Sequence, residues 1–571
     1  MDFVTEKSIY EGSWQSFERM ISRLLTYEGF ENVRLVGGSG DNGADVIATK
    51  FNKRWLFQAK QWKKPVGLEV IEETLHALAV YNAQIPVIVA SHGFDNNAYQ
   101  MQRQLMTQGI RLQLWNAQTL LEHFNRVPNQ IVNSKPIRDY QENAIQSIVQ
   151  AFVSEHDNKA LIVLATGLGK TFVAAEAIRR MRMLKPLRLL VLAHANPLVS
   201  QLEKAFWQFL RPTESTVVWN GNEKPSEYEL KNADCVFACV DTVGGAIDHF
   251  VAYDFDVIIV DECHHAGSST YKKVLSYYSA GKKDGPFLIG LTATPWRKDE
   301  EDIKEVFGDP RISIDMVFGM KNGFLTNVDY RVHIDNIRWE NLRDLDGNAF
   351  SPRQINRTLF INQWDDAVVE ELRKVWYEQS KPRAIVFCGT IEHAITMRDR
   401  INALGFCRAE AIFSAGRLSG EKQSLFEKNR LLSDFSDGIV NVICTVDVFN
   451  EGIDVPDVNI IVFQRVTHSR RIFIQQLGRG LRISDDKDKV IVLDFVSDVR
   501  RIAADIDLSN QLIVKEKSRI DIPNKVVFKR VGGEDPQAES FLREWLEDVA
   551  SIENAGEDDP ATLKFPPAYD I

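Results

Sequence analysis

The sequence lacks any run of about twenty uncharged apolar residues, which is the length that a membrane-spanning helix needs. Its first residues, MDFVTEKSIYEGSW, contain neither the basic nor the apolar segment of a secretion signal. Cysteine is scarce: the 571 residues include six, with no C-x-x-C spacing, which argues against a disulfide framework or a zinc site. Most of the six lie in apolar runs, as reduced thiols do in a cytosol. The sequence therefore predicts a cytoplasmic protein with no membrane partner.

The sequence also has no excess of basic residues. The formal net charge is −11, whereas nucleic-acid-binding proteins are usually basic. Residues 533–571 hold eleven acidic and two basic side chains, so this acidic tail accounts for most of the deficit. The tail could solvate the chain or bind a partner, and we favour solvation. Elsewhere, basic clusters provide local positive potential, for example Lys53, Arg54, Lys60, Lys63 and Lys64.

The length and the apolar pattern indicate several α/β domains. A chain of 571 residues exceeds what one hydrophobic core supports. In residues 13–125 short strands alternate with helices, and in 159–292 and 383–495 continuous apolar runs do so, as parallel strands buried on both faces would. We expect an N-terminal α/β domain followed by two tandem parallel-sheet domains. The expected boundaries are 1–130, 131–300, a charged connector at 301–361, 362–513, and a polar C-terminal segment at 514–571 with a short amphipathic helix at 538–552.

The segment ALIVLATGLGKT has the composition of a phosphate-binding loop. Glycines let backbone N–H groups approach phosphate oxygens, the lysine reaches the β- and γ-phosphates, and the final threonine hydroxyl holds Mg²⁺. The N-terminus of the following helix adds its dipole. The general pattern has glycine where this chain has Leu164, so the loop departs from it at one position. The predicted nucleotide-binding residues of the loop are Thr166, Gly167, Gly169, Lys170 and Thr171.

Two adjacent carboxylates end another apolar run, FDVIIVDECHH. Asp261 and Glu262 stand at the carboxyl end of a predicted parallel strand, where ligands bind in open parallel sheets. Asp261 can hold Mg²⁺, usually through water, and Glu262 can orient and deprotonate the attacking water. Taken alone, such a pair of carboxylates is about as often a solvated strand end as it is a functional site. Together with the phosphate-binding loop, it predicts ATP hydrolysis.

With these two motifs, the chain resembles the superfamily 2 helicases and translocases, close to the DExH branch that includes the helicase subunits of type III restriction enzymes. The resemblance spans about residues 138 to 495 and implies two RecA-like domains that use ATP and Mg²⁺. It implies that LAHANPLVSQ contacts the nucleic-acid backbone and that GLTATP, with His264, couples ATP to the bound strand; His265 has no assigned role. The further nucleotide-binding positions that the resemblance implies are Arg138, Gln141, Gly452, Asp454, Gln475, Arg479 and Arg482.

Arg479 and Arg482 belong to QQLGRGLR and are three residues apart on a predicted helix, so they share one face. An arginine inserted toward the γ-phosphate stabilises the charge of the transition state and contributes roughly 10³ to 10⁵ in rate. We therefore expect the two parallel-sheet domains to close around ATP and to open after hydrolysis.

The N-terminal domain carries a second candidate site. Asp45 opens one predicted strand, and Gln58 and Lys60 are two residues apart on the next, so they share one face. Glu18, on the first predicted helix, could complete the cluster. Hydrolysis of a phosphodiester needs an acidic metal ligand, a second ligand and a lysine, because Mg²⁺ activates water while the lysine orients the nucleophile.

This cluster resembles that of the PD-(D/E)xK nucleases, and most closely that of the Mrr-like restriction endonucleases, over about residues 13 to 125. The resemblance implies a restriction-endonuclease-like fold with Asp45 and Gln58 as metal ligands and with Lys60 and Glu18 in the catalytic group. Gln58 stands where the general pattern has a carboxylate, and an amide is the weaker ligand. Among the Mrr-like enzymes, a glutamine is frequent at this position.

Two interpretations of function follow. In the first, the chain is an ATP-dependent restriction or antiviral-defence enzyme, in which a motor moves on duplex DNA and the N-terminal domain cuts it. In the second, the N-terminal domain only binds or senses DNA and the motor remodels it. An RNA substrate is a third, weaker option. A homodimer or other defence-system subunits are expected partners, since one nuclease site cuts one strand at a time.

Overall fold

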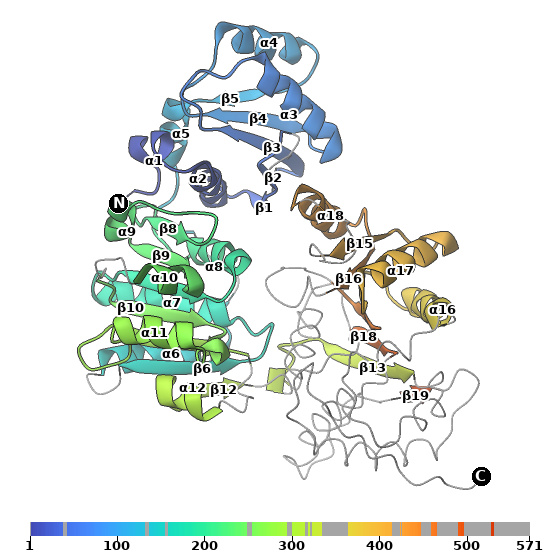
Figure 1. Cartoon of the computed structure of the whole chain (residues 1–571). Coiled ribbons are helices and arrows are strands. Elements are labelled where there is room, and N and C mark those ends of the chain that lie inside the picture. The colour runs from blue at the N-terminus through green and yellow to red at the C-terminus, as the bar shows by residue number, and fades with distance from the viewer. Residues whose placement is uncertain are drawn as a thin grey trace. The chain divides into compact units, whose positions relative to one another are not determined.

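The computed structural model of the chain contains two compact units, residues 1–164 with 169–313 and residues 165–168 with 314–571 (Figure 1). No helix in the part of the chain that the structure describes is both long and apolar enough to cross a membrane. The described residues are 2–37, 43–131, 136–154, 158–247, 254–293, 300–314, 318–319, 322–333, 364–413, 423, 425–446, 458–464, 489–495 and 527–529.

The N-terminal domain is a five-stranded mixed sheet in the order β1-β2-β3-β4-β5, antiparallel from β1 to β3 and parallel from β3 to β5. Along β4, Val87 and Val89 join the core beneath α2, while Ile88 and Ala90 join the core beneath α3 and α4. Both faces of the sheet are therefore covered. The elements are α1 (Glu6–Tyr10), α2 (Trp14–Tyr27), β1 (Glu31–Leu35), β2 (Val46–Lys50), β3 (Lys53–Lys60), α3 (Leu68–Val80), β4 (Ile85–Ala90), α4 (Asn96–Thr107), β5 (Gln113–Trp115) and α5 (Ala117–Phe124).

The second sheet has seven strands in the order β12-β6-β11-β10-β7-β9-β8, and the six strands from β6 to β8 in this order are parallel. Its elements are α6 (Asp139–Val153), β6 (Lys159–Leu164), α7 (Lys170–Leu184), β7 (Leu189–Ala193), α8 (Asn196–Trp207), β8 (Thr216–Trp219), α9 (Glu227–Asn232), β9 (Cys235–Cys239), α10 (Val240–Ala246), β10 (Val257–Asp261), η2 (Cys263–His265), α11 (Ser269–Tyr277), β11 (Phe287–Thr292), α12 (Glu300–Phe307) and β12 (Pro310–Ile314).

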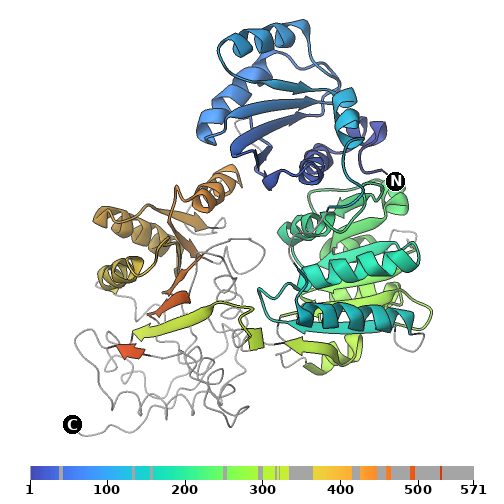
Figure 2. The same ribbon diagram turned by 180° about the vertical axis from the view of Figure 1, so that it is seen from behind.

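Helices cover this second sheet on both faces. Helices α6 and α7 lie on one face (Figure 2) and α10 and α11 on the other (Figure 1). Along β9, Phe237 contacts Phe206 of α8, with ring centroids 5.3 Å apart. The alternate residues Val236 and Ala238 pack instead in a cluster with Tyr271 of α11. Because both sides of each central strand are buried, the sequence of these strands is continuously apolar.

The third sheet also has seven strands, in the order β15-β16-β14-β17-β18-β13-β19, and all are parallel. Its core contains buried residues of α16 and α17, such as Leu372 and Met397, packed on the sheet. The elements are β13 (Asn327–His333), α16 (Trp364–Trp376), β14 (Ala384–Phe387), α17 (Ile391–Leu404), β15 (Ala409–Phe413), α18 (Leu425–Asp437), β16 (Val442–Val446), β17 (Ile460–Phe463), β18 (Lys489–Asp494) and β19 (Val527–Lys529).

The predicted fold class, an α/β domain followed by two parallel-sheet domains, is confirmed. The segment 301–361, for which the sequence predicted only a connector, contributes one strand to each large sheet: β12 lies beside β6, and β13 lies between β18 and β19. Strand β8 was not predicted either. The helix predicted at 538–552 lies outside the described residues.

Candidate nucleotide and nuclease sites

The phosphate-binding loop connects β6 to α7, and its backbone requires glycine. Gly167 and Gly169 have φ angles of +91° and +88°, in the left-handed region that residues with a Cβ avoid. A Cβ on Gly169 would also lie 2.9 Å from Nε2 of Gln141. Gln141 is on α6, where its Oε1 accepts the backbone N–H of Arg138 at 3.1 Å. The structure thus places Gln141, one of the predicted nucleotide-binding residues, against the loop.

Lys170 begins α7 and Glu262 follows β10, and their side chains form an ion pair, with Nζ and Oε1 2.6 Å apart. Burial alone would raise the pKa of Glu262, but Lys170 and His264 lower it well below its usual range. Glu262 also has a left-handed backbone, with φ of +47°. Such a conformation costs a residue with a side chain about 1 to 3 kcal/mol and is frequent at functional sites.

Asp261 fits a cation at this site. Its side chain is buried at the end of β10, and Oδ1 accepts no hydrogen bond from the described residues. Burial and the adjacent Glu262 raise the pKa of this carboxyl group. Buried carboxylate oxygens are normally satisfied, and Mg²⁺ takes oxygen ligands and bound waters. Thr171, in the first turn of α7, is the second predicted Mg²⁺ ligand and is half-buried.

Three histidines, of which His264 is buried, join three strand ends beside this carboxylate pair. His264 Nδ1 lies 3.1 Å from Thr292 Oγ1 and 3.3 Å from Glu262 Oε2, so it connects the ends of β10 and β11. The ring of His265 lies 4.3 Å from that of His264 and 4.3 Å from that of His194, which follows β7. His265, which had no role in the sequence analysis, therefore lies between two motifs that are distant in sequence. No local pattern could have predicted this contact.

Several predicted nucleotide-binding positions lie outside the described residues, so their roles stay predictions. The same holds for Thr294 of GLTATP. The positions concerned are Gly452, Asp454, Gln475, Arg479 and Arg482.

In the N-terminal domain, Asp45 and Glu18 are both buried and approach one point. Asp45 stands just before β2, where its Oδ2 accepts the backbone N–H of Ala59 at 2.6 Å. A Cβ placed on Gly37 would lie 2.8 Å from Asp45 Oδ1 and 3.2 Å from Glu18 Oε2. Glu18 comes from α2, so the structure brings together the strand and helix residues that the sequence analysis selected.

Gln58 and Lys60 meet at Glu73, a residue of α3 that sequence reasoning missed. Gln58 is fully buried; its Nε2 donates to Glu73 Oε2 at 3.0 Å, and its Oε1 accepts from the hydroxyl of Thr74. Lys60 Nζ lies 3.7 Å from the same Glu73 oxygen. The only signal for Glu73 was a glutamate on the helix after QAK, and Glu69 and Glu72 share that property.

Gly43 explains part of the glycine-rich segment before Asp45. Its φ is +86°, and a Cβ there would lie 2.7 Å from the carbonyl carbon and oxygen of Glu73. Only glycine lets this loop approach the backbone of α3. Within the described ranges, no three His, Cys, Asp or Glu side chains converge as a metal site. A cation beside Asp45 and Glu18 would therefore need an amide, a backbone carbonyl or water as further ligands.

The fold and the two sites define a P-loop ATPase core joined to a nuclease-type domain, and comparisons with known proteins agree. Residues 9–124 match the family described as "Restriction endonuclease", residues 134–297 match "Type III restriction enzyme, res subunit", and residues 366–484 match "Helicase conserved C-terminal domain". The chain therefore holds, in this order, a segment similar to restriction endonucleases and two segments similar to the two parts of a helicase core.

The similar proteins include helicases and restriction-enzyme subunits. The putative mitochondrial ATP-dependent helicase irc3 of Schizosaccharomyces pombe is 28% identical over 65% of this chain and 59% of its own length. The type I restriction enzyme EcoAI endonuclease subunit of Escherichia coli is 28% identical over 65% of this chain and 46% of its own length. The EcoKI subunit of the same species is 25% identical over 67% and 36%. A solved structure of the ATP-dependent type ISP restriction-modification enzyme LlaBIII bound to DNA has the same fold, with a TM-score of 0.54 and 18% identity over 94% of this chain and 42% of that chain. The chain spans about half the length of the curated relatives that it matches.

Proposed function

We propose that the chain is an ATP-dependent DNA translocase or helicase with a linked Mg²⁺-dependent endonuclease activity, working in restriction or antiviral defence. The observation that carries this proposal is a pair of side-chain groups in one compact unit: Asp261 with the ion pair of Lys170 and Glu262, and the acidic cluster of Asp45 and Glu18 in a domain that also holds Lys60 against Glu73. The restriction enzymes among its relatives support the biological setting.

In the nucleotide site, Lys170 would exchange its Glu262 partner for the β- and γ-phosphates of ATP. Glu262 would then be free to accept a proton from the attacking water. Thr171 and Asp261 would hold Mg²⁺, which neutralises phosphate charge when bound. Gln141, beside the loop, and Arg138, which precedes the first residue of α6, would contact the adenine. Arg479 and Arg482 are proposed to stabilise the γ-phosphate charge.

In the nuclease site, Asp45, Glu18 and the amide of Gln58 would supply ligands for a divalent cation, which activates water and neutralises the scissile phosphate when bound. Lys60 would orient the nucleophile. Glu73 would act indirectly, because it holds the side chains of both Gln58 and Lys60. Two copies of the chain would be needed to cut both strands together, which makes a homodimer on DNA part of the proposal.

The test is a plasmid cleavage assay with parallel measurement of ATP hydrolysis. We expect Lys170→Ala to abolish ATP hydrolysis, because Lys170 is the only cationic side chain of the loop ATGLGKT that can neutralise the β- and γ-phosphates. Asp45→Ala should abolish cleavage and spare ATP hydrolysis. Glu69→Ala, at an exposed carboxylate on α3, is the matched control and should do neither. Cleavage that survives in purified Asp45→Ala protein would contradict the site assignment.

A second candidate function is that the N-terminal domain only binds or senses DNA. The amide at Gln58, already hydrogen-bonded to Glu73 and Thr74, favours it, because a weak ligand lowers cation affinity. Active ATP hydrolysis with intact plasmid in Mg²⁺ and in Mn²⁺, with and without ATP, would support this alternative. Comparing the stimulation of ATP hydrolysis by duplex DNA, single strands and RNA identifies the substrate of the motor.

A further inference from the structure

Helix α2 of the nuclease domain presents one face to the nuclease site and another to the ATPase domain. Glu18 lies toward Asp45 and Gly37 in the nuclease site. Arg19, Arg23 and Tyr27 are spaced by four residues and therefore share a different face. All three side chains are buried, and each forms an ion pair or a hydrogen bond with a residue of the ATPase domain. A single helix thus carries a proposed catalytic carboxylate and the contacts to the motor.

Arg19 and Tyr27 anchor the two ends of this face. Arg19 Nε lies 2.8 Å from Glu203 Oε2 of α8, and its NH1 also pairs with Glu223. Both acidic side chains are buried, so water does not screen these pairs. The hydroxyl of Tyr27 donates to the carbonyl of Trp207, at the end of α8, at 3.0 Å. Helix α8 begins in LAHANPLVSQ, the segment predicted to contact the nucleic-acid backbone.

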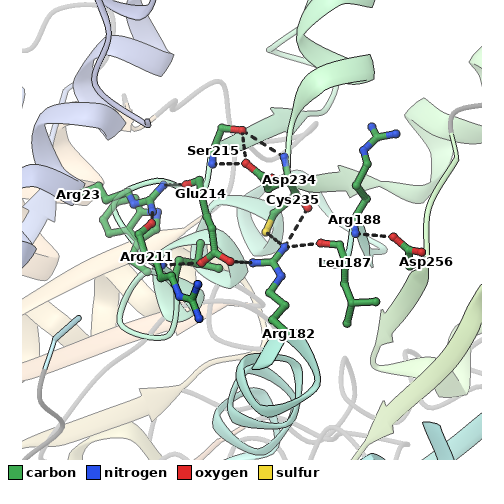
Figure 3. Close-up of polar contacts among 12 residues, drawn as sticks. Arg23, Arg182, Leu187, Arg188, Arg211, Glu214, Ser215, Asp234, Cys235 and Asp256 are labelled. Atoms are coloured by element: carbon green, nitrogen blue, oxygen red, sulfur yellow. Dashed lines mark hydrogen bonds and ion pairs between the residues drawn. The ribbon is translucent and has the colours of Figure 1, made fainter. Parts of the chain in front are cut away.

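Between Arg19 and Tyr27, Arg23 forms hydrogen bonds to the turn of residues 211–214 (Figure 3). Its guanidinium donates to the carbonyl of Glu214 at 2.9 Å and to that of Arg211 at 3.0 Å. The Glu214 side chain faces the other way, where Oε1 lies 3.0 Å from NH1 of Arg182 and Oε2 accepts the backbone N–H of Arg211 at 2.6 Å. The 211–214 turn is therefore held on one side by the nuclease domain and on the other by Arg182.

Arg182 belongs to α7, the helix that begins with Lys170 of the phosphate-binding loop. Its guanidinium also donates to the carbonyls of Leu187 and Asp234, so its position is tied to β7 and β9 as well (Figure 3). Twelve residues of helix separate Lys170 from Arg182, about 18 Å at the rise of an α-helix. A helix is stiff over this length, so a displacement of its first turn moves its last turn.

We propose that Glu214 is a positioning residue that joins the phosphate-binding helix α7 to the nuclease helix α2, so that the nucleotide bound at Lys170 sets the placement of Glu18 and thereby regulates DNA cleavage. The inference rests on the proposed function, because it needs both a nucleotide site and a nuclease site. A purely structural interface would hold the nuclease domain equally well in every nucleotide state. The two possibilities differ in what ATP binding changes at α2.

The first experiment measures hydrogen–deuterium exchange with and without a non-hydrolysable ATP analogue and Mg²⁺. In the native protein, we expect the analogue to change exchange both in residues 165–184 and in α2. In Glu214→Ala and in Arg23→Met, the change in residues 165–184 should remain and the change in α2 should be lost. Glu214→Gln, which keeps the size and one acceptor, should give an intermediate result and serves if the alanine variant does not fold.

The matched control is Arg179→Met, on the same helix as Arg182. Arg179 pairs within α7 with Glu176 and leaves the 211–214 turn untouched. It should behave as the native protein does. An unchanged α2 in the native protein, or an α2 that still responds in Glu214→Ala, would overturn the link alone. No response in residues 165–184 of the native protein would overturn the nucleotide site, and the link with it.

The second experiment compares plasmid cleavage with and without ATP. In Glu214→Ala, ATP hydrolysis and cleavage without ATP should persist, while the ratio of the two cleavage rates should fall toward one. A loss of about 5- to 150-fold in that ratio is the usual range for coupling between two sites. An unchanged ratio, in a protein whose native form responds to ATP, would overturn the proposal. A native enzyme that cuts equally with and without ATP would overturn it as well.

Discussion

The nucleotide site and the nuclease site hold their carboxylates in different ways. In the nucleotide site, Glu262 is paired with a lysine, and Asp261 keeps one buried oxygen without a hydrogen bond from the described residues. In the nuclease site, Asp45 accepts a backbone N–H, and Gln58 is bonded on both sides of its amide. The nucleotide site thus keeps a buried carboxylate oxygen available to a ligand. In the nuclease site, by contrast, the side chains of Asp45 and Gln58 already accept or donate hydrogen bonds within the protein. Single substitutions should therefore act more steeply on ATP hydrolysis than on cation binding by the nuclease.

The largest expected effect is that of Glu262→Gln. The amide cannot accept the proton of the attacking water, so ATP hydrolysis should fall by roughly 10²- to 10⁴-fold, the usual contribution of a general base. Nucleotide binding should persist, because Lys170 keeps its reach to the phosphates. Steady-state hydrolysis and titration with a fluorescent ATP analogue measure the two properties. Undiminished hydrolysis would remove Glu262 from its role and end the contrast between the sites.

Two glycine substitutions compare the rigidity of the sites. Gly43→Ala would press a methyl group against the backbone of Glu73, in addition to the left-handed φ, which costs a residue with a Cβ about 1 to 2 kcal/mol. Gly169→Ala meets only the end of the Gln141 side chain, which can move. We expect Gly43→Ala to lower the free energy of unfolding by about 2 to 3 kcal/mol, since the strained backbone and the clash add.

Gly169→Ala should cost less stability and mainly weaken nucleotide binding. Urea unfolding and nucleotide titration of both variants check the pair. An equal loss of stability in the two variants would show that the loops are equally rigid.

The swap of Gln58 and Glu73 sharpens the comparison further. Gln58→Glu provides a stronger cation ligand and places it against the Glu73 carboxylate. The Mg²⁺ concentration for half-maximal cleavage should fall about tenfold, which corresponds to about 1.4 kcal/mol, because a cation relieves the repulsion between the two carboxylates. Adding Glu73→Gln should remove part of that gain. An unaltered Mg²⁺ requirement in Gln58→Glu would mean that this position does not bind the cation.

The smallest effect concerns a charge outside both sites. Burial alone would raise the pKa of Asp329, but Arg331 and Lys489 lower it from an ordinary 3.8 to about 2. A lowered carboxyl pKa stabilises the fold above pH 3.8, and the stabilisation is lost as the pH falls toward 2. Asp329→Asn should cost about 1 kcal/mol at pH 7, given the partial exposure of the group. The cost should shrink at pH 3, as measured by urea midpoints at the two pH values. An equal cost at both would assign the effect to lost hydrogen bonds rather than to charge.

Much of the fold follows from local sequence. The continuous apolar runs of β6, β7, β10 and β11 predict buried parallel strands, because a strand covered on both faces has no polar side. The strands β12 and β13 were missed, since each lies at or near a sheet edge and carries charged residues such as Arg311 and Asp329. Their inclusion depends on neighbouring strands and not on their own pattern.

The residues of the candidate sites also fall into those that the sequence could predict and those that it could not. The loop with Lys170, the Asp261–Glu262 pair and the Asp45 and Lys60 positions could be selected from the sequence, because each stands at a strand end or alternates along a strand. Glu73 could not be distinguished from its helical neighbours Glu69 and Glu72. The left-handed backbone of Glu262 and the placement of Gln141 against Gly169 leave no trace in local spacing.

The amino-acid sequence by itself determined the order of the domains, most of the strands and the residue types of both sites, because hydrophobic periodicity and strand-end motifs are properties of short segments. Only the tertiary structure decided which distant side chains come into contact: His265 with the ring of His194, Gln58 with Glu73, and Arg182 with Arg23 through Glu214. Such contacts depend on how separate helices and strands pack together, and the residue spacing within one element does not predict that packing.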